Sequence, residues 1–407
     1  MIRYHVGIDA GKRKHHACVH DILEDRYTKI TPFTVDRQGF ERFLLFLRRQ
    51  CPAEEIIVGI ETSGPYSLTI GYFLMKHGYT VVELNPFQAS QFRKSQGKKA
   101  KTDQVDAQSL ADFIAVGSSK LLTLGDPIRE NLRELTRFRV DLVTDRNSEV
   151  NRLQETITIV FPELGSLLAS LDSPSALHLL STYPGPGALA EAGVEAVSAC
   201  LATASHGRLG SPPQAEAIVG AARTTVGMLG RERALALKLE ILAQVILSIN
   251  SHIQRVEANI EEMFHELSYN THDFPVGGVQ SLAGILAEID DIRRFPTIKQ
   301  FLSHFGWCPQ TFQSGGFQLA HPRMSHAGNR YVRRMVWMLA ILAVNTVPAY
   351  KDFLRRRTAA GKKKMHTIVA VGRKILSVIY AVLKTGIPYN PEGGASHSNP
   401  CPVLTSL

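Results

Sequence analysis

The apolar residues of one segment recur at alternating steps of four and three positions. The series comprises Leu235, Leu239, Leu242, Ile246, Ile249, Ile253, Val256, Ile260, Met263 and Leu267. This spacing places the apolar side chains on one stripe of an α-helix, which is typical of a coiled-coil seam. Because such a stripe is stable only when another helix covers it, the chain needs a partner helix, from itself or from a second copy.

A second long helix is predicted at about residues 128–160, where a looser apolar spacing is interrupted by Arg139 and Arg146. The two helices can pair within one chain or between chains, and the sequence leaves both possibilities open. Residues 162–230 lie between them, are rich in Ala, Gly, Ser and Pro, and predict only short helices. We therefore expect a helical, coiled-coil region at 126–270 with an insert at about 162–230, and a homo-oligomer, either a dimer or a tetramer.

The first 125 residues alternate between short apolar strands and helices. Strands are predicted at 4–9, 15–22, 29–35, 55–61 and 79–84, and helices at 38–49, 66–77, 86–95 and 103–115. Three strands in succession, followed by helices alternating with strands, predict a mixed sheet that is covered on both faces, as in ribonuclease H-like folds. The fold class is therefore α/β at the amino terminus and α in the remainder.

The carboxy-terminal part begins after a Pro/Gly break at 274–278. Helices are predicted at 282–292, 328–344 and 366–384, and a loop or short hairpin at 307–322. We expect a small, mainly helical domain at 271–387, followed by a flexible tail at 388–407 that is rich in Pro, Gly, Ser and Asn.

Charge is distributed unevenly along the chain. Residues 293–384 contain 17 Lys and Arg but a single acid, Asp352, so this segment carries +16 while the formal net charge of the whole chain is +9. A segment of one sign favours a polyanion-binding face, with nucleic acid as the leading candidate. A solvated basic surface or a membrane-surface patch is the alternative.

The remaining composition describes a globular protein, with 44% hydrophobic and 20% charged residues. The longest purely apolar stretch, Met335–Val344, is too short to cross a bilayer, and we expect no membrane partner. The five cysteines are odd in number, scattered and without a C-x-x-C pair, which favours reduced thiols in the cytoplasm.

Four acids stand where chain geometry can bring them together. Asp9 ends the first strand, Glu61 ends the buried fourth strand, and Asp103 and Asp106 share one face of a helix. In a ribonuclease H-like sheet the first and fourth strands are neighbours. Such a cluster repels itself unless cations bind it, and a pair of hard cations ~4 Å apart suits an all-oxygen site and phosphoryl displacement. The metal expected here is Mg²⁺.

Each acid taken singly has a structural explanation. Asp9 can shape a turn, Glu61 can cap the following helix, and Asp103 is a first-turn acid that the helix dipole favours. The ordered set is harder to explain in this way, because both strand-end acids follow the same residues, Val-Gly-Ile.

Five sequence motifs resemble one family. V-G-I-D-A-G-K-R-K-H-H at 6–16, G-I-E-T-S-G-P-Y at 59–66 and K-T-D-Q-V-D-A-Q at 101–108 resemble the three acidic motifs of the DEDD transposases of the IS one-ten family of bacterial insertion sequences. Q-S-G-G at 313–316 and G-N-R-Y-V-R-R at 328–334 resemble the second conserved half of that family.

The resemblance implies a DNA recombinase with a RuvC-like amino-terminal domain, a coiled coil and a carboxy-terminal domain with a serine nucleophile. Asp9, Glu61, Asp103 and Asp106 would bind the metal, and Ser314 would attack DNA. It also implies donor and target DNA as substrates, a structured noncoding bridge RNA as guide, and a place in the bacterial cytoplasm, associated with the nucleoid when active.

The residues around Ser314 agree with this role but do not establish it. Two glycines after Ser314 permit close approach of a phosphate, and Arg323, Arg330, Arg333 and Arg334 follow within twenty residues. A serine needs a base or a metal to take its proton, and His321 and His326 are the candidates nearby. An ordinary tight turn is the alternative.

Two further groups of residues complete the prediction. Contacts to nucleic acid are expected from ten basic residues: Lys98, Lys99, Lys101, Arg323, Arg330, Arg333, Arg334, Arg355, Arg356 and Arg357. His15, His16 and His20 lie on one strand without a cysteine partner, and we expect surface histidines.

The leading hypothesis is a transposase that cleaves and rejoins DNA through a phosphoserine bond. A site-specific DNA invertase of the same family would share every motif. A metal-dependent junction nuclease without serine chemistry, or a coiled-coil nucleic-acid-binding protein whose acids are caps, are the alternatives from other classes.

Overall fold

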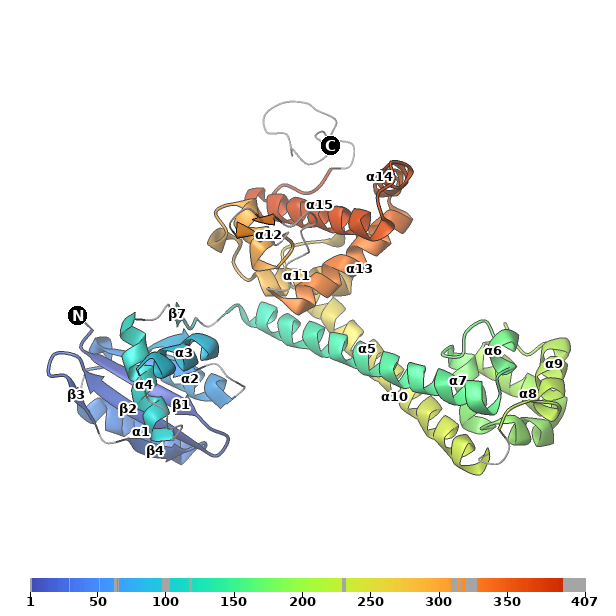
Figure 1. The fold of residues 1–407 in the computed structure, drawn as a ribbon, viewed down its shortest axis with the longest axis horizontal. Coiled ribbons are helices and arrows are strands. Elements are labelled where there is room, and N and C mark those ends of the chain that lie inside the picture. The colour runs from blue at the N-terminus through green and yellow to red at the C-terminus, as the bar shows by residue number, and fades with distance from the viewer. Residues whose placement is uncertain are drawn as a thin grey trace. The chain divides into compact units, whose positions relative to one another are not determined.

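The computed structural model divides into two compact units, residues 1–125 and 126–407 (Figure 1). It describes residues 2–28, 30–50, 52–61, 64, 66–96, 103–116, 119–123, 125–228, 232–308, 313–314, 317–318 and 328–390. For residues 103–105, 232, 313–314 and 317–318 only the backbone is described. The tail expected at 388–407 therefore lies largely outside the described residues.

The first unit is built on a mixed sheet of seven strands. They are β1 (Tyr4–Ala10), β2 (Lys14–Asp21), β3 (Arg26–Tyr27), β4 (Thr31–Thr34), β5 (Ile56–Glu61), β6 (Thr80–Leu84) and β7 (Lys120–Leu121). The order is β3-β2-β1-β5-β6-β7, and β4 also pairs with β2. β1 is antiparallel to β2 and parallel to β5. The expected neighbourhood of the first and fourth long strands is confirmed, and with it the ribonuclease H-like arrangement.

Helices cover both faces of this sheet. They are α1 (Arg37–Gln50), α2 (Tyr66–Lys76), α3 (Pro86–Ser95) and α4 (Asp103–Val116), with a 3-10 turn, η1, at Ala53–Glu55. The even-numbered residues of β1, such as Val6 and Ile8, share a core with α1 and α2. The other face packs against α4 and α3. One face of β1 therefore contributes apolar side chains to the core, and Asp9 lies on the other face, which α4 covers.

The second unit contains a helical hairpin. α5 (Pro127–Val160) and α10 (Glu232–His265) run antiparallel, because Arg139 bonds Glu257 at 2.7 Å while Arg146, further along α5, bonds Asn250 at 2.6 Å. The pairing that the sequence left open is therefore made within one chain. The two arginines that interrupt the apolar spacing of α5 are the residues that bridge the pair.

The insert forms a helical cap on one end of this hairpin (Figure 1). It consists of α6 (Leu164–Leu167), α7 (Pro174–Thr182), α8 (Pro186–Ala204) and α9 (Pro212–Arg223). Its apolar residues share a buried cluster with Leu153 of α5 and Leu242 of α10. α8 is kinked at Gly193, whose φ of 78° is the left-handed region that glycine adopts without strain.

A larger helical domain encloses the other end of the hairpin. It consists of α11 (Val279–Ile289), α12 (Ile298–His304), α13 (Arg330–Thr346), α14 (Pro348–Ala359) and α15 (Lys364–Thr385), with 3-10 turns η3 (Thr271–Asp273) and η4 (Ile292–Arg294). Its core includes Leu132 of α5 and Phe264 of α10. The sequence did not predict α14, because its run of arginines conceals the helical period. The predicted hairpin near residue 314 is present as β8 (Gln313–Ser314) and β9 (Phe317–Gln318).

By length and composition alone, α8, α10 and α15 could each cross a membrane, as could α13 and α14 together as a pair bent by 93°. In the sequence, α8, α10 and α15 do not form uninterrupted apolar runs, because polar and charged residues are scattered among their apolar positions. The most apolar window of α15 is 67% buried inside the protein. Much of the apolar surface of α15 is therefore used in packing between helices.

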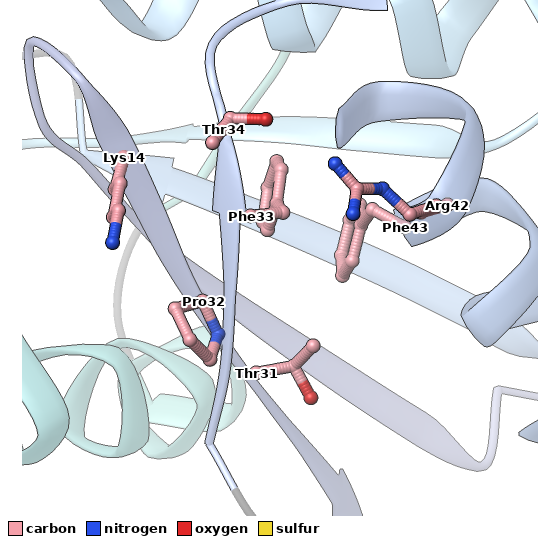
Figure 2. A pocket seen from close by; sticks show the side chains of 7 residues that line it. All are labelled: Lys14, Thr31, Pro32, Phe33, Thr34, Arg42 and Phe43. Atoms are coloured by element: carbon pink, nitrogen blue, oxygen red, sulfur yellow. The ribbon is translucent and has the colours of Figure 1, made fainter. Parts of the chain in front are cut away.

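On the α1 face of the sheet, His15 is completely buried, so the expectation of a surface histidine is wrong for this residue. Its ring lies 5.3 Å from that of Phe33 and 5.8 Å from that of Phe40. Burial, and then the charge of His16, lower the pKa of His15 to about 4. A pocket of about 290 Å³ opens between β4 and α1, with Lys14, Arg42 and Phe43 in its lining (Figure 2).

The burial of His15 predicts pH-dependent stability of the first unit. The unfolded histidine titrates near pH 6.5 and the folded one near 4, so protons favour the unfolded state as the pH falls through this window. The free energy of unfolding of the first unit falls by about 3 kcal/mol at and below pH 4. Hydrogen exchange of β2 in the full chain at pH 7 and 5 measures it. His15→Leu removes this part of the pH dependence. Equal pH dependence in wild type and His15→Leu would contradict the assignment.

A second prediction concerns the contact between α4 and β1. A Cβ atom on Gly7 would lie 2.2 Å from the carbonyl oxygen of Ala107 and 2.4 Å from the amide nitrogen of Ala111, both backbone atoms of α4. Gly7→Ala therefore forces α4 off the sheet, at a cost of about 1–3 kcal/mol, and increases hydrogen exchange in α4. The control is Gly220→Ala in α9, where nothing lies within 4 Å of the added methyl group. Unchanged exchange in α4 would contradict the close contact.

Candidate active site

Two of the four predicted acids lie side by side at one edge of the sheet. β1 and β5 are parallel and in register, with Ile8 opposite Ile60, so Asp9 and Glu61 occupy the next positions of the two strands. Side chains alternate between the faces of a strand, and Asp9 therefore shares the face of Gly7, and Glu61 that of Gly59. Cβ atoms on those glycines would touch Ala107 and Ile114 of α4. Both acids thus lie on the α4 face.

The direction of α4 places the other two acids at the same edge. Near its carboxyl end, Asp112 accepts a hydrogen bond from the Tyr27 hydroxyl at 2.7 Å and lies 3.6 Å from His20. His20 is the cross-strand partner of His5, near the start of β1, so the carboxyl end of α4 lies near the start of β1. Ala107, nearer the amino end of α4, lies over Gly7, which is further along β1. α4 therefore runs opposite to β1, and its amino end, with Asp103 and Asp106, points toward the edge that carries Asp9 and Glu61.

The Asp106 carboxylate is engaged by a cation from the protein itself. Arg93, near the end of α3, donates a hydrogen bond to it, and both side chains are less than one-fifth exposed. The rings of Phe92 and Phe113, 5.3 Å apart, hold the two helices together next to this pair. Arg93 thus supplies positive charge next to the Asp106 carboxylate.

The acids match Mg²⁺ in donor chemistry, since all four offer carboxylate oxygens, the ligands that hard cations prefer. Among the described side chains, no group of three or more His, Cys, Asp or Glu residues is close enough to hold a metal ion. The side chain of Asp103 lies outside that set. The described acids at this edge are therefore not arranged around a single metal position.

The sequence did not single out one residue at this edge. His16 is the cross-strand partner of Asp9 in the antiparallel pair of β1 and β2, so both side chains lie on the same face. The turn at residues 11–13 indicates a hairpin between β1 and β2, but the residue opposite Asp9 depends on the exact length of the turn. The residues alone do not determine that length.

Ser314 lies on the short hairpin β8–β9, paired with Phe317. Its side chain, the whole of Arg323 and the candidate bases His321 and His326 lie outside what the structure describes. The structure therefore locates the serine backbone on a hairpin of the second unit.

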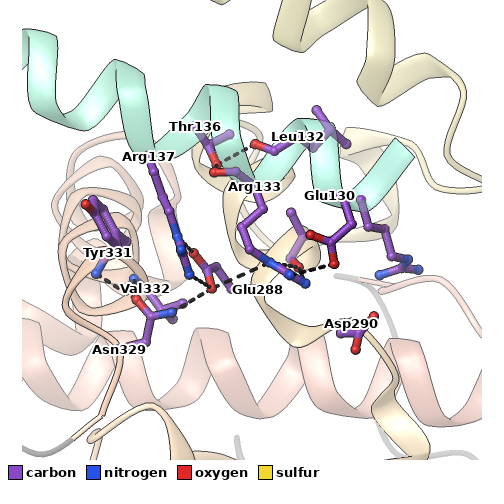
Figure 3. A network of polar contacts seen from close by, with 12 residues as sticks. Glu130, Leu132, Arg133, Thr136, Arg137, Glu288, Asp290, Asn329, Tyr331 and Val332 are labelled. Atoms are coloured by element: carbon purple, nitrogen blue, oxygen red, sulfur yellow. Dashed lines mark hydrogen bonds and ion pairs between the residues drawn. The ribbon is translucent and has the colours of Figure 1, made fainter. Parts of the chain in front are cut away.

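An ion pair on the largely buried Glu288 carboxylate anchors the chain at Asn329, at the start of α13 (Figure 3). The Glu288 carboxylate, 4% exposed, accepts hydrogen bonds from Arg137 of α5 at 2.6 and 2.9 Å and from the Asn329 amide at 2.7 Å. Asn329 in turn caps α13 by accepting from the amides of Tyr331 and Val332. Glu288 raises the pKa of the Arg137 guanidinium. Three helices are thus held together just after the segment that carries Ser314.

Several predicted nucleic-acid contacts also make bonds within the protein. Arg330 donates to the Tyr331 hydroxyl at 2.7 Å, Arg333 to the Gly328 carbonyl at 3.0 Å, and Arg334 to Thr144 at 2.7 Å. Lys98, Lys99 and Lys101 lie outside the described residues. Arg355 and Arg356 are exposed on α14, and Arg357 beside them is partly buried.

Comparisons with known proteins agree with the motifs. A transposase family model of the DEDD IS110 type matches residues 6–162, and a model described as transposase IS116/IS110/IS902 family matches residues 272–355. A T. thermophilus RuvC structure in complex with a Holliday junction substrate aligns over 29% of this chain and 99% of its own, with 19% identity and a TM-score of 0.22.

The similar proteins span most of the chain. An uncharacterized protein of insertion element IS116 from Streptomyces clavuligerus is 26% identical over 96% of both chains. An IS110 protein from Streptomyces coelicolor is 28% identical over 72% of both. A pilin gene-inverting protein from Moraxella lacunata is 22% identical over 96% of this chain and 98% of its own. The chain therefore belongs to the IS110/IS116/IS902 family of insertion-sequence transposases.

Proposed function

We propose that this transposase cuts and rejoins DNA through a covalent bond between Ser314 and a DNA phosphate, with Asp9, Glu61, Asp103 and Asp106 as a metal-binding site. The observation that carries the proposal is the parallel register of β1 and β5, which sets two carboxylates side by side, with the amino end of α4 directed to the same edge. Carboxylates gathered in this way repel one another unless a cation is shared.

In this reaction the Ser314 oxygen attacks phosphorus, the bond from phosphorus to one sugar oxygen breaks, and the serine proton passes to a base or to water. Attack by a sugar hydroxyl of another strand then restores a phosphodiester and frees the serine. The number of phosphate ester bonds is conserved, so no external energy source is required. Mg²⁺, when bound, would stabilise negative charge on the phosphate.

For the site to close, Asp106 has to exchange its bond with Arg93 for a place beside Asp9 and Glu61. The ion pair is made by two partly buried side chains on separate helices, so it can be broken without unfolding either helix. Arg93 then competes with the metal for one ligand.

Donor and target DNA are the proposed substrates, and a structured noncoding bridge RNA is the proposed guide, from the family resemblance. The basic carboxy-terminal segment supports polyanion binding of either kind. We propose that the protein acts as a homo-oligomer at the nucleoid of the bacterial cytoplasm. A site-specific invertase is the second candidate, because the pilin gene-inverting relatives match nearly the whole chain.

The first experiment looks for the covalent intermediate. The full-length protein is incubated with element-end and target DNA, the RNA transcribed from the element's noncoding end, and Mg²⁺. Denaturing gels and peptide mass spectrometry should show DNA attached to the peptide that contains Ser314. Ser314→Ala and Asp106→Asn should each abolish the adduct, a loss of at least about 10³-fold in rate.

The controls are Ser303→Ala, an exposed serine on α12, and Asp112→Asn, at the other end of α4. Both should form the adduct normally. Cleavage that survives Ser314→Ala without an adduct would replace the serine mechanism by a metal-dependent nuclease. Full activity of both Asp9→Asn and Asp106→Asn would remove the acids from the mechanism.

A second prediction concerns the competition at Asp106. Arg93→Gln should increase the affinity for Mn²⁺, used as a spectroscopic probe of the magnesium site, by about fivefold, because it removes an ion pair worth about 1 kcal/mol. Electron paramagnetic resonance of free Mn²⁺ measures this in the absence of DNA. Lys94→Gln, the exposed neighbour with the same charge change, should leave the affinity unchanged. Weaker Mn²⁺ binding by Arg93→Gln alone would mean that Asp106 is not a ligand.

A further inference from the structure

The turn that joins β1 to β2 carries three basic residues within five positions of Asp9. Lys12, Arg13 and Lys14 follow one another in the sequence, and all three are exposed. Neither the predicted acidic site nor the basic carboxy-terminal segment accounts for them. They lie in the same unit as the acids, so the register of the sheet determines which of them is close to the acids.

The register places Lys14 beside Asp9. His16 is the cross-strand partner of Asp9. Side chains alternate between the faces of a strand, so Lys14, two positions before His16, lies on the same face as both, the face that α4 covers. Residues that lie diagonally across an antiparallel pair are about 7–8 Å apart. Lys14 therefore places a cation next to Asp9, on the face that carries both strand-end acids.

The backbone of Lys14 is held from both sides. A Cβ atom on Gly11 would lie 2.5 Å from the Lys14 carbonyl oxygen, so the turn closes tightly against this residue. On the other side Lys14 pairs with Thr34 of β4, and the Val35 amide donates to the Arg13 carbonyl at 3.2 Å. A group that is already ordered loses less conformational freedom when a ligand binds.

The side chain of Lys14 is directed toward the row of Asp9. In Figure 2 it extends from the level of Thr34 toward that of Pro32. Pro32 is opposite His16, and His16 is opposite Asp9. Lys14 is exposed and lines the pocket between β4 and α1. Its ammonium group is therefore accessible to a ligand that approaches the edge with the acids.

A cation at this place has a defined chemical task. The carboxylates of Asp9 and Glu61 and the phosphates of DNA are all negatively charged, so this edge repels the proposed substrate. A lysine ammonium group has three donors and binds phosphate as a point charge. On the face of the acids it offsets the repulsion and fixes the position of the strand that carries the phosphate.

We propose that Lys14 binds a backbone phosphate, close to the scissile one, of the DNA strand that is cut at the edge carrying Asp9 and Glu61. This inference deepens the proposed function and rests on it, since it names a residue that positions the substrate at the same site. The contact is an ion pair, and no covalent bond changes at Lys14.

The test compares Lys14→Gln with Arg42→Gln. Arg42 lines the same pocket and is exposed, but it belongs to α1, which covers the opposite face of the sheet. Binding of the full-length protein to labelled element-end DNA is measured over a range of salt concentrations, in EDTA and with saturating RNA from the element's noncoding end. For Lys14→Gln we expect about fivefold weaker binding and a salt slope smaller by about 1. Arg42→Gln should match the wild type.

A second measurement separates a substrate contact from a structural role. Single phosphates near the cut are replaced by neutral methylphosphonates. At one position the replacement should weaken binding of the wild type and of Arg42→Gln by about fivefold and leave that of Lys14→Gln unchanged, because the partner is already lost. Lys14→Arg, which keeps the charge, should retain the sensitivity. The melting temperature of Lys14→Gln should equal that of the wild type, since the residue is exposed.

The outcomes distinguish this contact from the function on which it rests. If Lys14→Gln keeps the sensitivity to every methylphosphonate, or binds DNA as the wild type does, the phosphate contact is wrong, and the transposase mechanism stands wherever the wild type forms the Ser314 adduct. If the methylphosphonate pattern is found and no adduct forms, Lys14 binds DNA as proposed and the serine mechanism fails. If the wild type does not bind DNA, both proposals fail.

Discussion

The antiparallel pairing of α5 with α10 is the constraint on which the second unit depends. Each helix has 34 residues and is therefore about 50 Å long. Two helices alone cannot enclose a core, so their apolar stripes need cover at both ends. The insert helices cover one end and the carboxy-terminal helices the other, and each end has its own buried cluster. Between them, Arg139 and Arg146 join the helices by polar bonds.

This constraint explains which parts of the fold could be predicted. The heptad spacing of α10 and the strand pattern before Asp9 and Glu61 are local, so the sequence reveals them directly. The choice between pairing within one chain and between chains depends on contacts distant in sequence. The insert has too little periodicity to show that it caps the hairpin. The sequence does not predict α14 because an apolar stripe is lacking: Arg355 and Arg356 are exposed, and Tyr350 is the buried residue of this helix.

The candidate site was predictable to the same extent. Parallel neighbouring strands end at the same edge, so the meeting of Asp9 with Glu61 follows once the strand order is known. The engagement of Asp106 by Arg93 did not follow, since it depends on how α3 packs against α4. The burial of His15 was missed for a related reason. Its neighbours His16 and His20 share the α4 face, and only the register with Phe33 turns His15 toward the apolar core.

The sheet edge proposed as the metal site has an excess of negative charge, and Arg93 offsets part of it through its ion pair with Asp106. A fold selected for stability alone would separate or pair such charges. A metal ion bound in the proposed way would complete this edge, so binding energy and protein stability would be linked there. Arg93 would then substitute in part for the ion in the unliganded protein, and the affinity for the ion would be reduced accordingly.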